Sequence, residues 1–460
     1  MRRVHLVGIG GAGMSGIARL LLARGIAVSG SDAKDSHALA ALRALGAEVH
    51  VGHAAENIAG ASTVVVSTAV RESNPELLAA RASGTPVLRR AEALAELLEG
   101  YRSVAVAGTH GKTTTTSMLT ITLQHCGADP SYAIGGDLTG AVSEAHPGGN
   151  AHQGRGDLFV LEADESDGSF LVYRPHAAIV TNIEPDHLDH HGSIEAYEQV
   201  FREFADTVSE FVVACLDDPG SSSLLARPLG ARLLTYGTTE GADLQLHGLS
   251  TRGATSSYEA VLRGRSLGGV LLPVAGAHLA RNSAAALLTA VELGMPAAEV
   301  IEGLAAFTGV ARRMERKGAQ AGVTVYDDYA HHPTEVRAQL VAAREMARPG
   351  RVIVVFQPHL YSRTATFAEA FGQALGLADE VVVMDVYGAR EDPVPGVSGA
   401  SVAAAIPLPA ERVAFEPTWS AVADLVVSRA APGDLVVTMG AGDVTLLGPE
   451  VLALLRERAS

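Results

Sequence analysis

Short runs of apolar, mostly β-branched residues alternate with helical patterns along the first hundred residues. Residues 4–7, 26–29 and 63–67 are predicted strands, and residues 14–23 are a predicted amphipathic helix. Apolar strands separated by helices are typical of parallel sheets with helical crossovers. We therefore expect the segment up to about residue 98 to be a Rossmann-like α/β domain.

The same alternation starts again beyond this segment. The apolar runs that predict strands are residues 103–107, 158–161, 177–181 and 211–214, with helical spacers between them. Residues 220–272 are rich in Ser, Gly and Thr and show short alternating runs, so we expect a small β excursion there. Helical patterns return at residues 278–293 and 297–306. The pattern predicts a second α/β domain that ends near residue 311.

A third unit begins near residue 312. Its predicted strands are residues 352–356, 380–384 and 434–438, and a polar cluster follows each of them, at residues 357–359, 385–390 and 440–443. Ligands of open parallel sheets bind beyond the carboxyl ends of the strands. We therefore expect the three clusters to face one crevice.

The composition excludes several classes of protein. The chain has 460 residues and a formal net charge of −16, and 47% of its residues are hydrophobic and 19% charged. These proportions are close to those of ordinary globular domains and argue against disorder. Nucleic acids and anionic membranes bind basic surfaces, so this acidic chain is a poor partner for either.

Cysteine usage and the N-terminus indicate the compartment. Cys126 and Cys215 are too few for a disulfide framework, and we expect two free thiols in a reducing environment. The uncharged stretch near the N-terminus is rich in glycine and soon followed by arginines, which makes it a poor signal peptide. No apolar run approaches the ~20 residues that span a bilayer. We expect a soluble cytoplasmic protein.

A glycine-rich turn follows the first predicted strand and precedes the first predicted helix. It contains Gly8, Gly10, Gly11 and Gly13, and Asp32 stands 19 residues beyond the last of them. This layout is typical of dinucleotide sites, because the glycines let a pyrophosphate approach the helix N-terminus. NAD and a UDP-sugar both carry a pyrophosphate, so the motif does not separate them. A tight turn without a ligand is the other interpretation.

A second turn, residues 108–113, has the features of a phosphate-binding loop, although Val106 stands where the common pattern has its first glycine. Its glycines expose backbone N–H groups to phosphate, Lys112 can reach the β- and γ-phosphates, and Thr113 can bind Mg²⁺. The chain has only three lysines, which are Lys34, Lys112 and Lys317. One of them stands where this chemistry needs it. A polar turn without a ligand is the alternative.

Two acidic segments offer metal ligands. Residues 162–167 hold four acids at the end of a predicted strand, and close carboxylates usually face water or a cation. Residues 181–191 hold three histidines and three acids, which a zinc hydrolase could use. Their spacing matches no standard zinc pattern, and both cysteines lie elsewhere. A Mg²⁺–nucleotide site that draws on both segments is the favoured interpretation, and a solvated loop is the alternative for the first.

Four further polar groups are weaker signals by themselves. They are residues 276–282, 312–315, 327–335 and 357–364. Each is compatible with a capped helix or a solvated loop. Together they place polar residues in all the predicted units, which a purely structural role explains less well.

In this order the motifs resemble those of the Mur ligase family, and within it the alanine-adding branch. The matching segments are residues 8–16, 108–116, 162–170, 181–189, 278–282, 312–315, 327–335 and 357–364. Residues 164–167 together with 331–335 are specific to that branch and to a peptide-recycling relative. The resemblance implies a Rossmann-like UDP-substrate domain (1–98), a P-loop ATPase-like central domain (99–311) and a Rossmann-like amino-acid-binding domain (312–460).

The implied activity is that of an ATP-dependent carbon–nitrogen ligase in peptidoglycan precursor synthesis. It would join L-alanine to the carboxylate of UDP-N-acetylmuramate through an acyl phosphate, with two Mg²⁺ ions. Phosphorylation gives the carboxylate a good leaving group, and cations neutralise the anions that must approach each other. The implied protein is a monomer or a dimer that binds no nucleic acid and does not insert into a membrane.

The resemblance also implies roles for individual residues. The implied catalytic residues are Lys112, His187, Arg313 and His331. The implied ATP-binding residues are Gly108, Thr109, His110, Gly111, Lys112, Thr113, Thr114, His278, Asn282, Arg313 and Asp328. The implied UDP-substrate residues are Gly10, Gly11, Ala12, Gly13, Met14, Ser15, Asp32, Ser67, Thr68 and Ala69. Alanine would be bound by Tyr329, His331 and Arg363, and Mg²⁺ by Thr113, Glu162 and His187.

Three details qualify this implied site. His331 is a hypothesis for the base that accepts the amine proton, on the ground of an ordinary histidine pKa. Leu360 stands where many relatives have arginine, so Arg363 would carry more of the carboxylate binding. Some relatives bind Mg²⁺ through a carbamylated lysine, but no lysine lies between Lys112 and Lys317. The alanine-adding branch also lacks that lysine.

Three other functions stay open at this point. A recycling ligase that attaches a tripeptide to UDP-N-acetylmuramate shares most motifs. An NAD-dependent oxidoreductase would explain the first glycine turn and Asp32, but not Lys112 or the acidic segments. A nucleotide-binding scaffold without turnover would be expected to lack Lys112, Glu162 or His187, and all three are present.

Overall fold

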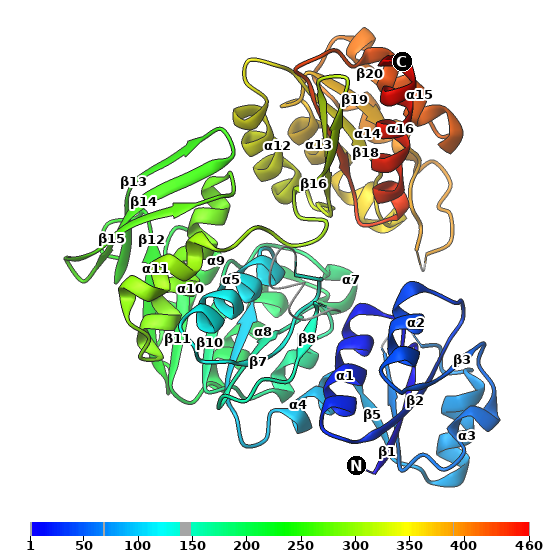
Figure 1. Ribbon diagram of the computed structural model, residues 1–460, viewed down its shortest axis with the longest axis vertical. Coiled ribbons are helices and arrows are strands. Elements are labelled where there is room, and N and C mark those ends of the chain that lie inside the picture. The colour runs from blue at the N-terminus through cyan, green and yellow to red at the C-terminus, as the bar shows by residue number, and fades with distance from the viewer. Residues whose placement is uncertain (1, 68–69, 139–148, 390, 460) are drawn as a thin grey trace. The chain divides into compact units, whose positions relative to one another are not determined.

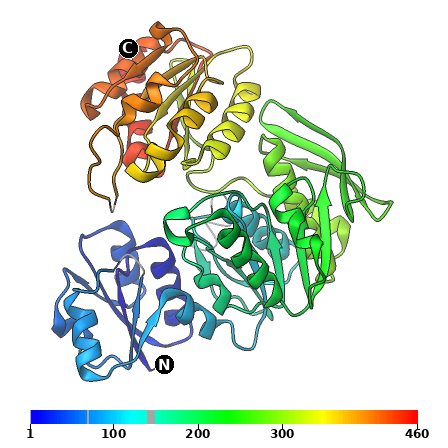
Figure 2. The same cartoon turned by 180° about the vertical axis from the view of Figure 1, so that it is seen from behind.

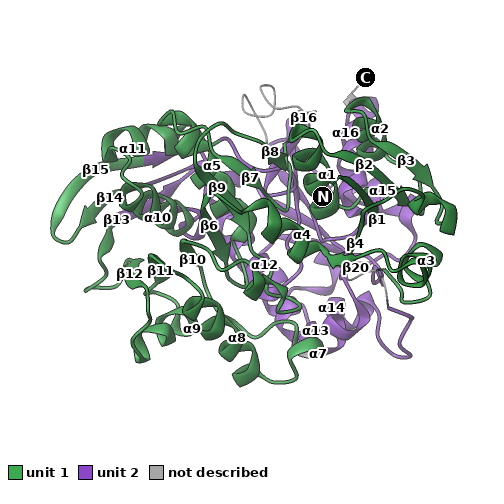
Figure 3. Cartoon of the chain, turned by 90° about the horizontal axis from the view of Figure 1, so that it is seen from below, with its two compact units in different colours: residues 1–247, 259–270, 281–307 green, residues 248–258, 271–280, 308–460 purple. Residues whose placement is uncertain are grey.

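The computed structural model describes residues 2–67, 70–138, 149–389 and 391–459, and its strands form three sheets with flanking helices (Figure 1). The chain packs into two compact units (Figure 3). One contains residues 1–247, 259–270 and 281–307, and the other contains residues 248–258, 271–280 and 308–460. The α/β class and the three successive sheets are as predicted, while the domain boundaries near residues 98 and 311 stay predictions.

The first sheet has five parallel strands in the order β3-β2-β1-β4-β5. They are β1 (Arg3–Val7), β2 (Ala27–Asp32), β3 (Glu48–Val51), β4 (Thr63–Val66) and β5 (Val87–Arg89). The helices are α1 (Ala12–Ala23), α2 (His37–Ala44), α3 (Pro75–Ser83) and α4 (Arg90–Leu97). Local signals start α3: the Asn74 side chain accepts N–H groups of its first turn, and Pro75 occupies its first position.

The second sheet has ten strands in the order β15-β14-β13-β12-β11-β10-β6-β9-β7-β8. They are β6 (Arg102–Ala107), β7 (Ser131–Ala133), β8 (Ala151–His152), β9 (Leu158–Glu162), β10 (Ala177–Val180), β11 (Phe211–Cys215), β12 (Arg232–Gly237), β13 (Leu244–Arg252), β14 (Thr255–Leu262) and β15 (Arg265–Leu272). The main helices are α5 (Lys112–His125), α8 (Ile194–Asp206), α10 (Ala277–Glu292) and α11 (Ala297–Ala305), with short α7 (Leu188–His191) and α9 (Pro219–Ser222). Residues 220–272 are β-rich as expected, but their strands extend the main sheet.

The third sheet has six strands in the order β16-β17-β21-β18-β19-β20, and only the β16–β17 pair is antiparallel. The strands are β16 (Glu315–Gln320), β17 (Val323–Asp328), β18 (Val352–Phe356), β19 (Glu380–Val383), β20 (Val413–Phe415) and β21 (Leu435–Met439). The helices are α12 (Pro333–Ala347), α13 (Tyr361–Leu375), α14 (Gly399–Ala404), α15 (Trp419–Arg429) and α16 (Leu447–Ala459).

Helices cover both faces of this third sheet (Figures 1 and 2). Val352, Val354 and Phe356 of β18 pack in one apolar cluster with residues of α12 and α13. Ile353 and Val355 pack in another with residues of α15 and α16. Because alternate residues of a strand point to opposite faces, a strand buried on both sides is apolar throughout, and this explains the uninterrupted apolar run at 352–356.

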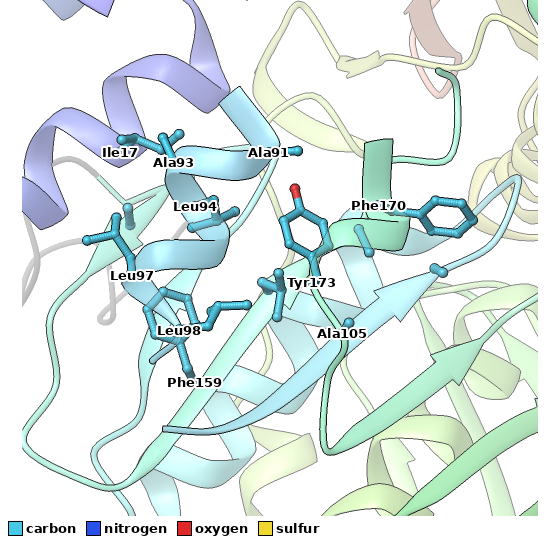
Figure 4. Packing of buried hydrophobic residues seen from close by; sticks show 14 of the residues in the cluster. Ile17, Ala91, Ala93, Leu94, Leu97, Leu98, Ala105, Phe159, Phe170 and Tyr173 are labelled. Atoms are coloured by element: carbon cyan, nitrogen blue, oxygen red, sulfur yellow. The ribbon is translucent and has the colours of Figure 1, made fainter. Parts of the chain in front are cut away.

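One apolar cluster of the first unit joins the first sheet to the second (Figure 4). Ile17 of α1 and Leu94 and Leu97 of α4 belong to the same cluster as Phe159 of β9 and Tyr173. All five side chains are nearly inaccessible to solvent. This packing fixes α4 against the second sheet and thereby places the glycine turn of the first sheet relative to β9.

Two smaller expectations concern the thiols and the membrane. Cys126 and Cys215 are both free, as predicted, and Cys215 is buried in β11. Among the described residues, no helix combines the length and the apolar character needed to cross a bilayer.

Candidate functional site

The glycine turn after β1 is held by the end of β2. The N–H groups of Gly8 and Ile9 donate to the carbonyl oxygen of Ser31, at 2.8 and 3.0 Å. The N–H of Gly10 donates to the Asp32 carboxylate at 2.9 Å. Gly8 has a φ of +79°, a conformation that favours glycine. Asp32 therefore shapes the turn itself, and its predicted role toward the UDP substrate stays a prediction.

The other residues predicted to bind the UDP substrate differ in exposure. Gly11 and Ala12 are exposed at the start of α1. The side chains of Met14 and Ser15 are buried, since Met14 packs in the apolar cluster and the Ser15 hydroxyl donates to the carbonyl oxygen of Ala12. Their predicted roles toward the UDP substrate stay predictions. Ser67 directly follows β4, which neighbours β1. Thr68 and Ala69 lie outside the described residues.

Arg90, a residue that the sequence motifs did not indicate, lies beside the glycine turn. A Cβ on Gly13 would meet its Nη1 at 2.6 Å. Its other terminal nitrogen forms an ion pair with Asp164 at 3.2 Å. Burial acts to raise the pKa of Asp164, but Lys112 and Arg90 outweigh it and hold that pKa below its ordinary value. Arg90 thus connects the glycine turn to the acidic segment after β9.

The phosphate loop after β6 is anchored by the residues that follow β10. The N–H of His110 donates to the Asn182 side chain at 2.8 Å, and the Thr181 hydroxyl donates to the carbonyl oxygen of His110 at 2.6 Å. Gly108 has a φ of +132°, and a Cβ there would collide with Thr181. Gly111, at φ +82°, precedes α5. The loop therefore needs glycine at both positions.

Lys112 begins α5 and points back under this loop. Its Nζ donates to the carbonyl oxygens of Gly108 and Thr109 at 2.7 and 3.1 Å. It also pairs with the carboxylate of Glu165 at 2.8 Å. Burial acts to lower the pKa of Lys112, but the neighbouring carboxylates outweigh it and raise that pKa. The lysine is therefore a charged group held inside the loop. Thr114, in the first turn of α5, is buried.

Thr113 and Glu162 form the part of the site that fits a hard cation. The Thr113 hydroxyl donates to Glu162 Oε1 at 3.0 Å, and the N–H of Gly135 donates to Oε2 at 2.6 Å. Hydroxyl and carboxylate oxygens are ligands that Mg²⁺ prefers, so this pair fits that ion. His187, the third predicted ligand, has a φ of +51°, and its Nε2 lies 3.6 Å from Asp186. Its role as a metal ligand stays a prediction.

Helix α10 carries the two residues predicted to lie near adenine. Asn282 is buried and faces the phosphate loop, since a Cβ on Gly111 would meet its side-chain amide at 3.0 Å. His278 stands one helical turn earlier. Residues four apart share a helix face, so the two side chains emerge on the same side of α10.

In the second unit the predicted residues Arg313, Asp328 and Tyr329 form one cluster. The guanidinium of Arg313 lies 5.1 Å from the Tyr329 ring centre, and that of Arg312 lies 4.8 Å from it. Asp328 is fully buried and accepts N–H groups from Met314 and Ala330 at 2.7 and 2.8 Å. Burial raises the pKa of Asp328 to about 7. Its predicted contact with ribose stays a prediction.

His331 lies next to Tyr329, with 5.3 Å between ring centres, and its charge environment includes Arg363. Its Nδ1 donates to the carbonyl oxygen of Tyr329 at 3.1 Å, which leaves Nε2 as the acceptor. Burial, reinforced by Arg363 and His359, lowers the pKa of His331 to about 3. This lowered pKa differs from the ordinary value on which the predicted role as a base rested. The His331 side chain is 21% exposed, and its role as the base stays a prediction.

The polar clusters that follow β18, β19 and β21 contact one another, and the crevice that they were expected to face stays a prediction. The Gln357 amide donates to Asp443 at 2.7 Å, and the rings of His359 and Tyr387 stack with 5.9 Å between centres. Arg390 lies outside the described residues. Leu360 is buried and has a φ of +69°, an unusual conformation for a branched residue, directly before α13. Arg363 is buried on the first turn of that helix.

Comparisons with known proteins agree with these features. The chain matches the family models "Mur ligase family, catalytic domain" over residues 3–102, "Mur ligase middle domain" over 106–290 and "Mur ligase, glutamate ligase domain" over 312–442. A UDP-N-acetylmuramate–L-alanine ligase of Saccharopolyspora erythraea is 58% identical, over 98% of this chain and 93% of the relative. The ligase of that name from Mycobacterium tuberculosis is 53% identical, over 100% and 96%.

Solved structures show the same fold. The UDP-N-acetylmuramate-alanine ligase of Thermotoga maritima has a TM-score of 0.85 at 29% identity and covers 100% of both chains. A murein peptide ligase of Psychrobacter arcticus has a TM-score of 0.73 at 24% identity, over 99% of both chains. At 24% identity, the similarity to the murein peptide ligase shows the fold alone.

Proposed function

The chain belongs to the Mur ligase family, and from this premise we propose that it joins L-alanine to the carboxylate of UDP-N-acetylmuramate with conversion of ATP to ADP and phosphate. The observation that carries the proposal is the identity of 58% and 53%, over nearly the whole chain, with relatives named for that reaction. Membership of a ligase family leaves an NAD-dependent oxidoreductase without support.

The reaction has two steps. A carboxylate oxygen of the muramate attacks the γ-phosphorus of ATP, the bond to ADP breaks, and an acyl phosphate forms. The alanine amine then attacks the acyl carbon, and the C–O bond of the tetrahedral intermediate breaks to release phosphate. Two anions must approach each other in the first step, and Lys112 is the cation that the phosphate loop provides for this.

The residues of the first unit supply the phosphate and metal sites. Gly108, Thr109, His110, Gly111 and Thr114 shape the loop and its helix, and Asn282 lies against it. Thr113, Glu162 and His187 would hold Mg²⁺, with two ions as in the implied family site. Bound Mg²⁺ shields phosphate charge as a Lewis acid. Support for the metal site is the hydrogen-bonded pair of hydroxyl and carboxylate at 3.0 Å.

The glycine turn is the proposed site for the UDP moiety. Gly10, Gly11, Ala12 and Gly13 lead into α1, whose N-terminus favours a pyrophosphate. Arg90 adds a cation beside Gly13. Asp32 holds the turn through Gly10, and Ser67 follows the neighbouring strand. The positive charge of Arg90 beside the turn supports the proposal, because a diphosphate is an anion.

The second unit supplies the proposed alanine site around Tyr329, His331 and Arg363. Arg363 pairs with the alanine carboxylate, because a buried guanidinium is suited to that anion. His331 is neutral near pH 7 and presents Nε2 as an acceptor, so it orients an N–H of the amine. Its low pKa makes His331 a poor acceptor for the proton of the amine, and this proton is released to solvent. From the family resemblance alone we propose that Arg313 binds the γ-phosphate, Asp328 the ribose and His278 the adenine.

The test is phosphate release from ATP and Mg²⁺ with UDP-N-acetylmuramate and a series of acceptors. The proposal predicts release that requires both the UDP-sugar and L-alanine, with little from glycine, L-serine or no acceptor. Release only with the tripeptide would assign the recycling reaction instead. Absence of release with every acceptor would refute a ligase.

A further inference from the structure

Lys112 has its donor capacity filled by the protein itself. An ammonium group has three N–H bonds. Among the residues that the structure describes, its three hydrogen-bond partners are the carbonyl oxygens of Gly108 and Thr109 and the carboxylate of Glu165. A phosphate oxygen that binds Nζ must therefore replace one of these three.

Glu165 is the partner that a nucleotide would replace. The two carbonyl groups belong to the phosphate loop, so they stay with the lysine when the loop binds a ligand. Glu165 comes from the segment after β9, and its carboxylate is fully buried. Two anions beside one ammonium repel each other strongly where water is excluded. The phosphate and the carboxylate consequently compete for the same group.

Glu165 has a second hydrogen-bond partner, which remains when Lys112 moves away. The Tyr197 hydroxyl of α8 lies 3.3 Å from Glu165 Oε1, and it also lies 3.0 Å from the Thr109 hydroxyl. Glu165 thus keeps a hydrogen-bond donor after Lys112 moves. Burial raises the pKa of Glu165 to about 7, although Lys112 acts to lower it. Once Lys112 has moved to the phosphates, the Glu165 carboxylate can therefore also take up a proton.

We infer that Glu165 is a counter-ion that holds Lys112 in the nucleotide-free enzyme and yields it to the phosphates of a bound nucleotide. This inference rests on the proposed use of ATP. Glu165 does not take part in bond formation. It sets how tightly the phosphate loop holds ADP and therefore how readily this product leaves.

The experiment is isothermal titration of the full-length chain with ADP in the absence of Mg²⁺. Glu165→Gln keeps the size of the side chain and removes its charge. The variant should bind ADP at least about tenfold more tightly than the unchanged chain, a gain of about 1.4 kcal/mol. Adenosine, which has no phosphate, should bind both proteins with dissociation constants within twofold. In steady state the variant should show a lower KM for ATP and a lower kcat.

A matched control removes one charge nearby without touching the lysine. Glu198 follows Tyr197 on α8 and pairs with Arg202 at 3.3 Å, so Glu198→Gln should leave ADP affinity within twofold. Glu165→Asp withdraws the carboxylate by one methylene and should give an intermediate gain, and it replaces Glu165→Gln if that variant does not fold. Thermal melting of each variant confirms the folded state.

The outcomes separate this inference from the proposed function. Equal or weaker ADP binding by Glu165→Gln would overturn the exchange and make Glu165 a fixed support for the loop. An equal gain for adenosine would also overturn it, because the effect would not involve phosphate. Failure of the unchanged chain to bind ADP would refute the proposed function as well.

Discussion

A buried carboxylate behind the glycine turn makes a contribution to stability whose magnitude can be predicted. Glu76 is fully buried in α3. It accepts hydrogen bonds from the Ser31 hydroxyl at 2.5 Å and from the Asn57 amide at 2.6 Å, and it lies 3.5 Å from the buried ring of His5. Burial acts to raise the pKa of Glu76, but these partners outweigh it and lower that pKa from 4.5 to about 2.

The size follows from the difference between the two pKa values. Each unit corresponds to about 1.4 kcal/mol, so the charged form of Glu76 contributes about 3 kcal/mol to stability near neutral pH. Because the folded pKa is the lower one, this contribution is present above pH 4.5 and is lost as the pH falls toward 2. About 1 kcal/mol remains at pH 3. Glu76→Gln has no such dependence.

The measurement is native-state hydrogen–deuterium exchange of the peptides that contain β1 and β2, because exchange reports local opening free energies in a chain with several units. Glu76→Gln should lower the opening free energy there by about 3 kcal/mol at pH 7 and by about 1 kcal/mol at pH 3. Glu72→Gln, which breaks an exposed pair with Arg81, should change neither value. Equal protection of Glu76→Gln and the unchanged chain at pH 7, or the same loss at both pH values, would refute the reasoning.

Three further substitutions test the proposed site. Gly108→Ala should abolish ATP binding in equilibrium titrations, because its Cβ would collide with Thr181. Gly127 has a φ of +75° with open space around it, so Gly127→Ala should leave the affinity for ATP unchanged. Similar losses of affinity in both variants would contradict the argument. Arg90→Met should raise the KM for the UDP-sugar by at least about tenfold, because a charged hydrogen bond contributes about 1.5–3 kcal/mol, and an unchanged KM would remove Arg90 from the site. Arg363→Met should raise the KM for L-alanine by at least about tenfold on the same reasoning, while an equal rise for ATP would indicate a structural role.

The sequence was most informative where function depends on neighbouring residues. The phosphate loop, its glycines and Lys112 lie within a few positions, so their chemistry could be predicted from spacing alone. The polar clusters after β18, β19 and β21 were also predictable. Parallel strands bring their carboxyl ends to one edge of a sheet, and Gln357 and Asp443 meet there, 86 residues apart.

Contacts between distant segments were not predictable. Arg90 and Asp164 are 74 residues apart, and the packing of α4 against the second sheet brings them together. Glu165 and Tyr197 likewise meet only through the placement of α8. Desolvation, Arg363 and His359 lower the pKa of His331, and the sequence does not show that these two charged groups lie near it.

The most direct test of the central claim follows oxygen from the muramate carboxylate. UDP-N-acetylmuramate labelled with ¹⁸O at both carboxylate oxygens is incubated with ATP, Mg²⁺, L-alanine and the full chain. The masses of the products are then measured by mass spectrometry. Attack of the carboxylate on the γ-phosphate predicts one ¹⁸O in each phosphate released and one retained in the new amide. Unlabelled phosphate would show that the carboxylate is not activated in this way and would contradict the account.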